Sequence, residues 1–118
     1  MDSNISSNPD CIFCNIANHS VAANILYESD NVIIVKDIMP KAPVHVQVMP
    51  KRHIESVNGL TDADTALIAE MILAAKNYAA KAGIGTSGYK LVLNTGKEGG
   101  QIIPHLHMHL LGGKQLEE

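Results

Sequence analysis

Hydrophobic and polar positions along this 118-residue chain follow two different periods, and each period predicts its own kind of element. Strict period-two alternation over 44–50 predicts a β-strand, because successive side chains of a strand point to opposite faces. The β-branched segments 24–29 and 31–38 are separated by an Asp-Asn turn signal and predict a hairpin. Two later segments, 88–96 and 103–113, predict the remaining strands.

Helical spacing of apolar residues predicts two helices. A short helix is predicted from Ile12 to about Asn18, and a long one over about 62–82. Thr61 can cap the long helix, and Gly83 ends it. Three strands, the long helix and two more strands predict an α+β fold with an antiparallel sheet covered mainly on one face.

Composition limits the chain to one compact unit. Hydrophobic residues make up 46% of the chain and aromatic residues only 3%, so the core is mostly aliphatic. We expect a disordered polar leader over 1–10 and a single domain over 11–118.

Charge and hydropathy exclude two classes of partner. The net charge is -3 and no basic cluster exceeds Lys51-Arg52, so we expect no nucleic-acid partner. No apolar run approaches a membrane span and the N-terminus does not resemble a secretory signal, so we expect no membrane partner. The prediction is a soluble, cytoplasmic protein.

Three of the six histidines occupy alternate positions in the last predicted strand. His105, His107 and His109 would share one face, with neighbours roughly 6–7 Å apart. The residues between them are apolar and would face the core, which indicates that the histidines line a wet surface or a cleft.

Three interpretations of this row are open. It could be a histidine-rich strand without function, or two of its members could chelate zinc together with a ligand from another strand. It could also serve phosphoryl or nucleotidyl transfer, in which one imidazole attacks phosphorus and its neighbours bind phosphate oxygens and move protons. Gly99, Gly100 and Gln101 offer unhindered backbone N–H groups to an anion, and Asn94 offers an amide, which favours the third interpretation.

The two cysteines, Cys11 and Cys14, are too close in sequence to join distant segments. A C-x-x-C pair indicates metal binding or redox chemistry, although two reduced thiols can also pack as small apolar groups. No βαβ context accompanies the pair, which disfavours a thioredoxin-like role.

The segment "HLHMHLL" resembles the His-φ-His-φ-His-φ-φ signature of the histidine triad (HIT) superfamily. "CIFCNI", "DIMPKAPVHVQVMPKRHI" and "GYKLVLNTGKEGGQ" also fall in that family's order and spacing, so the resemblance covers 11–113 and is strongest to the Hint branch. It implies a HIT-like α+β fold with a five-stranded, mainly antiparallel sheet, one long and one short helix, and sheets joined across a homodimer.

The resemblance also implies an activity. Hint proteins hydrolyse or transfer purine nucleotides of the AMP or GMP type at the α-phosphate, with phosphoramidates as favoured substrates. His107 would be the nucleophile that forms a nucleotidyl-histidine intermediate, and His109 would contact phosphate oxygens. The carbonyl of His105 would orient the His107 ring, and His45 would assist proton transfer.

Further positions match the family's nucleotide contacts. Asp37 matches the residue that accepts ribose hydroxyls, and Asn94 with Gly100 and Gln101 would hold phosphate or the leaving group. The residues that match the apolar slot around the base are Ile12, Phe13, Ile16, Val35 and Ile38. Ile102 departs from the pattern, because many Hint proteins have Ser there.

Some family members bind structural zinc, and the matching ligands here are Cys11, Cys14, His53 and His105. Cys2His2 is a common tetrahedral zinc set. Catalysis through His107 would need no cofactor. The alternatives to a phosphoramidase are a dinucleoside polyphosphate hydrolase, a nucleotide-binding regulatory module with little turnover, and a metal-dependent hydrolase that uses the histidine row directly.

Overall fold

The computed structural model describes residues 8–118. The predicted leader over 1–10 therefore lies mostly outside the described residues. Residues 8–10 form a turn in which the carbonyl of Asn8 accepts a hydrogen bond from the backbone N–H of Cys11 at 3.0 Å.

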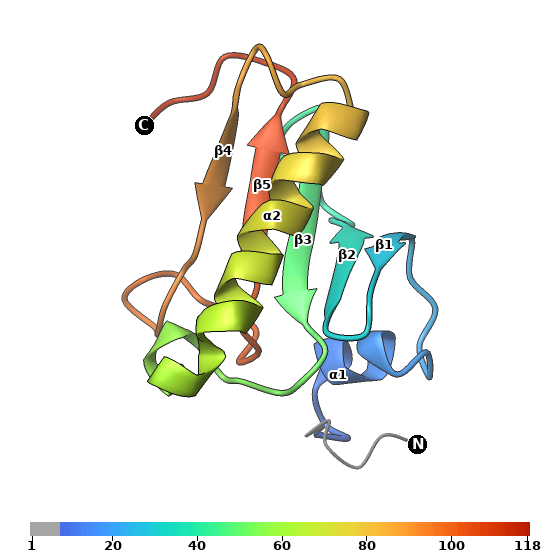
Figure 1. Ribbon diagram of the computed structural model, residues 1–118, viewed down its shortest axis with the longest axis vertical. Helices are drawn as coiled ribbons and strands as arrows, with labels where there is room; N and C mark the ends of the chain where they lie inside the picture. The colour runs from blue at the N-terminus through green and yellow to red at the C-terminus, as the bar shows by residue number, and fades with distance from the viewer. Residues whose placement is uncertain (1–7) are drawn as a thin grey trace.

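A five-stranded sheet forms the centre of the molecule, and every pair of neighbouring strands is antiparallel (Figure 1). The strand order is β1-β2-β3-β5-β4, so β4 and β1 are the two edges. The strands are β1 (Ile25–Glu28), β2 (Val32–Lys36), β3 (Val44–Pro50), β4 (Tyr89–Val92) and β5 (Met108–Gly112). The predicted α+β fold with a five-stranded antiparallel sheet is confirmed.

The helices also follow the predicted order. They are α1 (Ile12–Ala17) and α2 (Thr65–Lys81), with the 3-10 turns η1 (Val57–Gly59) and η2 (Asp62–Asp64) between β3 and α2. Thr61 and Asp64 form a capping box, in which Oδ2 of Asp64 accepts from the N–H of Thr61 at 2.9 Å. The first predicted turn of the long helix is therefore 3-10 rather than α. No helix in the part of the chain described, 8–118, has the length and apolar character needed to cross a membrane.

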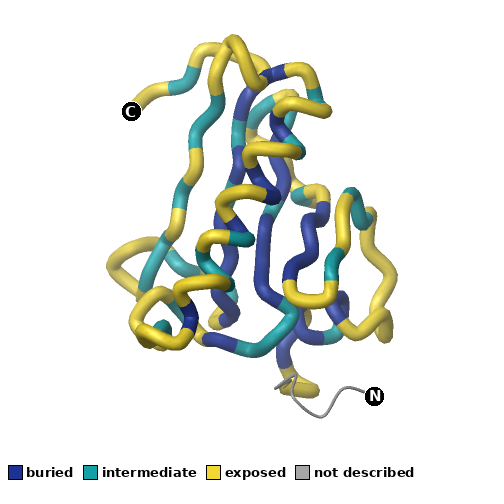
Figure 2. Tube along the Cα trace, in the orientation of Figure 1, coloured by how far each residue is buried: buried dark blue, intermediate teal, exposed yellow. Residues whose placement is uncertain are grey.

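The main core lies between the sheet and α2. Alternate residues of β2, β3 and β5 face this helix, and its buried face is Met71, Ala74, Ala75 and Ala79. The small alanine side chains let the helix approach the sheet closely. Figure 2 shows the burial concentrated in β2, β3 and β5, whereas β4 is more exposed.

The opposite face of the sheet packs against α1. Phe13, Cys14 and Ile16 form a second apolar cluster with Ile33 and Met49 of the central strands. The two helices therefore cover opposite faces, and the face under α1 is the one that carries the histidines.

The last strand is shorter than predicted. It begins at Met108, and 103–107 follow bends and irregular backbone. Pro104 and Pro50 lack N–H groups and cannot continue the ladder between β3 and β5. The N–H of Leu106 instead donates to the carbonyl of Ile54 at 2.6 Å.

Candidate active site and metal-ligand cluster

The three alternating histidines keep a common face even though only His109 lies within β5. Leu106, Met108 and Leu110 belong to the core under α2, so the histidines point to the other side of the sheet. Of the two predicted settings, a wet surface or a cleft, the wet surface is wrong for two of them, since His105 is 0% and His107 7% exposed. Phe13 of α1 covers both rings edge-on, with centroid separations of 5.8 and 5.0 Å.

A backbone contact orients the ring of His107. Its Nδ1 lies 2.6 Å from the carbonyl oxygen of His105. A carbonyl only accepts hydrogen bonds, so Nδ1 carries the proton and, in the neutral ring, Nε2 has a free lone pair. His107 thus has the tautomer that a nucleophile requires.

His45 and His109 are joined ring to ring. The backbone N–H of Lys41 donates to Nδ1 of His45 at 3.0 Å, so the neutral His45 ring carries its proton on Nε2. That Nε2 lies 3.0 Å from Nδ1 of His109 and 3.3 Å from Oδ2 of Asp37. His109 therefore accepts at Nδ1 and has an N–H donor on Nε2.

Both of these histidines are neutral at pH 7. Burial, together with the neighbouring His107 and His45 rings, lowers the pKa of His109 to about 4 against the opposing effect of the Asp37 carboxylate. Burial also lowers the pKa of His45, against the opposing effect of Asp37. In the buried ring of His105, desolvation likewise lowers the pKa to about 4.

The depressed pKa of His109 predicts a pH-dependent stability. Between the ordinary value of 6.5 and about 4, the unfolded chain holds a proton on this histidine that the folded chain does not. The free energy of unfolding therefore falls as the pH falls through this window, and the contribution is fully present above 6.5. Denaturant titrations should show that the free energy of unfolding falls less from pH 7 to pH 4.5 in His109→Gln than in the wild type. An equal loss would show that His109 does not carry this dependence.

A largely apolar cavity of about 650 Å³ opens beside the histidines, which is a suitable size for a nucleotide. Six residues expected from the sequence to contact a nucleotide line it: Ile12, Phe13, Ile16, Val35, Asp37 and Ile38. Helix α1 forms one wall and the segment after β2 another. Ile38 lies at the rim, where it is 94% exposed.

Five other expected nucleotide contacts lie outside the cavity lining: Asn94, Gly100, Gln101, His107 and His109. The side chain of Asn94 donates to the carbonyl of Gly99 at 2.8 Å, across the loop that also contains Gly100. Gln101 accepts from the N–H of Gly96 and donates to the carbonyls of Glu55 and Ile103. These contacts hold the loop in shape.

Gln47 lines the cavity and was not among the residues expected there. Its Nε2 donates to Oδ2 of Asp37 at 2.7 Å. The alternation of β3 could have identified it, because Gln47 is two residues from His45 and therefore on the same face.

A second group of side chains converges beneath α1. Four residues each place one ligand atom within 4.8 Å of the other three: Cys11, Cys14, His53 and His105. Sγ of Cys14 lies 3.2 Å from Nδ1 of His53 and 3.5 Å from Nδ1 of His105, and Sγ of Cys11 lies 3.4 Å from Nδ1 of His105. Tetrahedral zinc with ordinary bond lengths gives sulfur-to-nitrogen edges of about 3.6 Å. The cluster could therefore bind zinc.

Local structure orients these donors. Cys11 is the N-cap of α1, and its sulfur accepts from the N–H of Cys14 at 3.4 Å, which brings both thiols to one end of the helix. Nε2 of His105 lies 2.8 Å from the carbonyl of Pro50 and so carries the proton, which leaves the lone pair on Nδ1 facing the sulfurs.

Asp37, His45 and His109 also lie within 4.8 Å of one another, but this group is unsuitable for a metal. The nitrogen of His45 that faces the group is Nε2, which carries a proton because Lys41 donates to Nδ1. An imidazole cannot ligate through a protonated nitrogen. This geometry disfavours a metal-dependent hydrolase that uses the histidine row directly.

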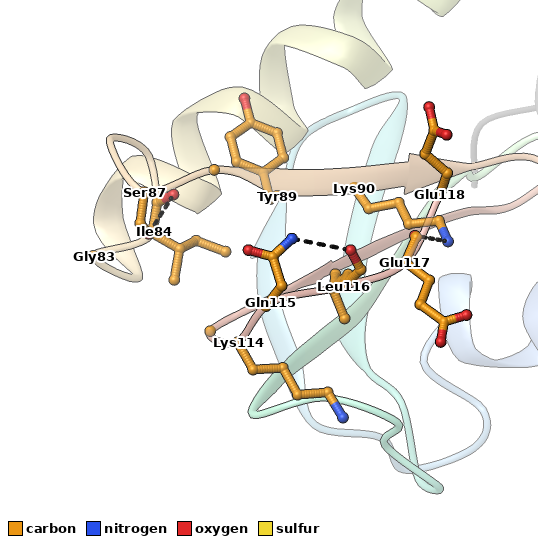
Figure 3. A pocket seen from close by; sticks show the side chains of 12 residues that line it. Gly83, Ile84, Ser87, Tyr89, Lys90, Lys114, Gln115, Leu116, Glu117 and Glu118 are labelled. Atoms are coloured by element: carbon orange, nitrogen blue, oxygen red, sulfur yellow. Dashed lines mark hydrogen bonds between the residues drawn. The ribbon is translucent and has the colours of Figure 1, made fainter.

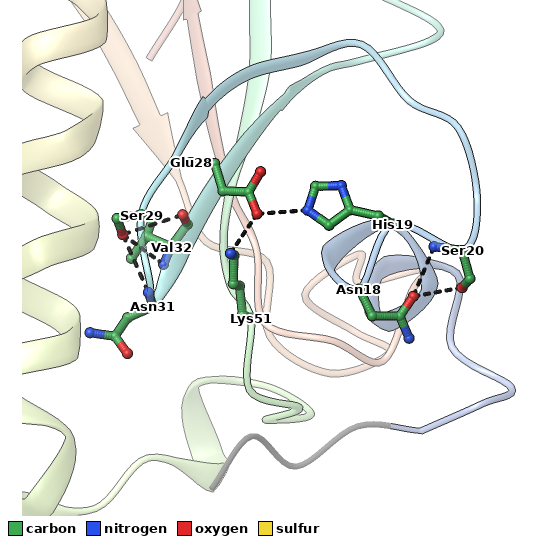
Figure 4. A network of polar contacts seen from close by, with 8 residues as sticks. All are labelled: Asn18, His19, Ser20, Glu28, Ser29, Asn31, Val32 and Lys51. Atoms are coloured by element: carbon green, nitrogen blue, oxygen red, sulfur yellow. Dashed lines mark hydrogen bonds and ion pairs between the residues drawn. The ribbon is translucent and has the colours of Figure 1, made fainter. Parts of the chain in front are cut away.

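Two other features lie apart from this site. A cavity of about 750 Å³ lies between the α2–β4 turn and the C-terminal segment, where Lys90 donates to the carbonyl of Glu117 (Figure 3). On the surface, Glu28 binds both His19 and Lys51, which ties the turn after α1 to β1 and to the end of β3 (Figure 4).

Comparisons with known proteins assign the family. Residues 10–117 match the family described as "Scavenger mRNA decapping enzyme C-term binding". The chain is 43% identical over 107 residues to an uncharacterized HIT-like protein of Synechococcus elongatus. The match covers 91% of this chain and 93% of that protein.

Solved structures agree with this assignment. The crystal structure of a HIT family hydrolase from Legionella pneumophila superposes with a TM-score of 0.90 at 40% identity, covering 92% of this chain and 96% of that one. A zinc-bound histidine triad family protein from Mycobacterium smegmatis superposes with a TM-score of 0.77 at 27% identity, covering 89% and 76%. The fold, the alternating histidines and these matches together show that the chain belongs to the histidine triad superfamily.

Proposed function

We propose that this protein hydrolyses purine nucleoside phosphoramidates at the α-phosphorus through a nucleotidyl intermediate on His107. The observation that carries the proposal is the 2.6 Å contact between Nδ1 of His107 and the His105 carbonyl, which leaves Nε2 as the free nucleophile. The solved relative from Legionella pneumophila is described as a hydrolase, which supports the reaction class.

In the first step, Nε2 of His107 forms a bond to the α-phosphorus while the bond from phosphorus to the leaving amine breaks. The amine takes up a proton from solvent and departs. The Nε2–H of His109 donates to phosphate oxygens, whose charge increases in the transition state. His45 acts through His109, because its Nε2 lies 3.0 Å from Nδ1 of that ring.

In the second step, water attacks the same phosphorus and the bond to His107 breaks. The proton of the water passes to solvent, and the nucleoside monophosphate leaves with the imidazole restored. The apolar cavity holds the base and Asp37 holds the ribose, so the phosphate lies toward His107 and His109. An apolar slot stacks on adenine and guanine alike, which gives modest selectivity between purines.

The test is turnover of adenosine 5′-phosphoramidate against diadenosine polyphosphates. A higher kcat/KM with the phosphoramidate supports the proposal. A higher value with the dinucleotides would assign the protein to polyphosphate hydrolysis, and tight nucleotide binding without turnover of either would make it a regulatory binding module.

The proposal includes a structural zinc ion. Its ligands would be Cys11, Cys14, His53 and His105. All four tetrahedral positions would be taken by protein side chains, so no position remains for substrate. The ion would fix α1 against the sheet. Since α1 supplies Ile12, Phe13 and Ile16 to the cavity, the cluster supports nucleotide binding through this helix.

The proposed assembly is a homodimer whose sheets join at β4. This edge strand carries Leu91 as an exposed apolar side chain, Leu93 follows directly after it, and α2 carries Ile72 and Leu73. Leu91 is the register partner of Leu110 and so lies on the same face of the sheet. Helix α2 covers this face at β2 and β3. An uncovered edge with apolar neighbours favours pairing with a second copy.

Leu91→Glu is expected to convert the dimer to monomers, because it places a charge at the centre of the proposed interface. Light scattering after size exclusion should give twice the chain mass for the wild type and the single chain mass for the variant. Tyr27→Glu places the same charge on β1, the opposite edge, and should remain dimeric. A monomeric wild type, or a dimer retained in Leu91→Glu, would contradict this assembly.

A further inference from the structure

Gln47 lies at the junction between the cavity and the histidine cluster. Its register partners are Val35 on β2, which lines the cavity, and His109 on β5. Its amide is therefore a polar group within a largely apolar wall, next to Asp37.

The carboxylate of Asp37 is already heavily engaged. Oδ1 accepts from the backbone N–H of Met39 at 2.8 Å, and Oδ2 accepts from Nε2 of Gln47 at 2.7 Å. Nε2 of His45, whose single proton points to Nδ1 of His109 at 3.0 Å, lies 3.3 Å from Oδ2. Oδ2 is therefore crowded by the amide of Gln47 and the ring of His45, whereas Oδ1, with one hydrogen bond, keeps a free acceptor position. A ribose diol presents two hydroxyl groups, and one position satisfies only one of them.

The amide orientation of Gln47 supplies the second acceptor. Because a carboxylate only accepts, Nε2 must face Asp37 and Oε1 must point away from it. Oε1 has no hydrogen-bond partner among residues 8–118, and no fully buried side-chain oxygen in that range lacks a partner. Oε1 of Gln47 is therefore accessible, in a residue that lines the cavity.

We propose that Gln47 is a specificity-determining residue whose Oε1 accepts a hydrogen bond from one ribose hydroxyl while Oδ1 of Asp37 accepts one from the other. The inference rests on the proposed nucleotide-binding function and adds a preference for ribonucleotides over deoxyribonucleotides. A site with acceptors for both hydroxyls disfavours a sugar that lacks either one.

The experiment measures dissociation constants by calorimetry for adenosine 5′-monophosphate and its 2′-deoxy and 3′-deoxy analogues. The wild type should bind the ribonucleotide most tightly. Gln47→Leu should weaken ribonucleotide binding by about 3- to 10-fold, the effect of one neutral hydrogen bond. It should leave unchanged the affinity for the analogue that lacks the hydroxyl bound by Gln47. Gln115→Leu, the same change in the C-terminal segment, should alter none of the three constants.

Each outcome has a separate meaning. If Gln47→Leu leaves both ribose-to-deoxyribose ratios at their wild-type values, or weakens all three ligands equally, the inference is overturned while nucleotide binding stands. If the wild type binds none of the three ligands, both the inference and the proposed function are overturned. Should thermal unfolding show that Gln47→Leu does not fold, Gln47→Met, which keeps the chain length without the amide, decides in its place.

Discussion

Replacing His107 by alanine is expected to lower the turnover of adenosine 5′-phosphoramidate by about 10⁴-fold or more, since removal of a covalent nucleophile removes the reaction path itself. The variant should still bind adenosine 5′-monophosphate, because the cavity and Asp37 are unchanged. Steady-state kinetics together with calorimetric binding separate these two effects.

His19→Ala is the matched control for this substitution. The ring of His19 contacts Glu28 on the surface and lies outside the cavity lining, so its loss should leave kcat and KM at wild-type values. Full turnover in His107→Ala would show that another group attacks phosphorus.

The same turnover measurement is repeated on wild-type protein from which metal has been removed. Folded wild-type protein without metal should keep its kcat, because the proposed zinc ligands exclude substrate from the ion. Complete loss of turnover that returns on adding metal would instead indicate catalysis by the ion.

Removing a ligand of the proposed zinc site is expected to have the largest effect on stability. The wild type should hold about one zinc ion per chain, and Cys14→Ser or His53→Ala should hold almost none. At free zinc a thousand times its dissociation constant, binding to the folded state alone stabilises it by about 4 kcal/mol. For a chain of this size, this corresponds to a fall in Tm of roughly 15 °C in the variants.

Elemental analysis and thermal unfolding with and without a chelator measure this effect, and His19→Ala again serves as the control. Since α1 supplies part of the cavity wall, the variants should raise KM more than they lower kcat. A wild-type protein that takes up no zinc at saturating concentration, or full occupancy in Cys14→Ser, would contradict the structural ion.

The spacing of apolar residues predicted a helix or strand well where those residues all lie on one buried face of the element. The alternation of 44–50 was sufficient for β3, since its side chains point alternately toward α2 and toward the histidines. The long helix was equally clear, because its stop at Gly83 requires the positive φ of 81° that glycine adopts freely. The strand predicted over 103–113 was too long, since pairing depends on a neighbour that the local pattern does not contain.

The sequence by itself determined which side chains share a face. The spacing of His105, His107 and His109 places them on the face opposite Leu106, Met108 and Leu110, and the motif identified the family before any distance was known. Periodicity is a property of neighbouring residues, so it can be read along the chain.

Only the tertiary structure decided what each of these groups can do. The acceptor role of Nδ1 of His109 depends on His45, 64 residues earlier in the sequence, and the burial of His105 depends on α1, whose N-cap Cys11 lies 94 residues earlier. The partnership of Gln47 with Asp37 likewise requires β3 to pass beside the end of β2. The tautomers of His107 and His45 are set by contacts only two and four residues away in the sequence. Burial and acceptor count are set by contacts between distant segments, because a hydrogen bond acts over about 3 Å in space whatever the separation along the chain.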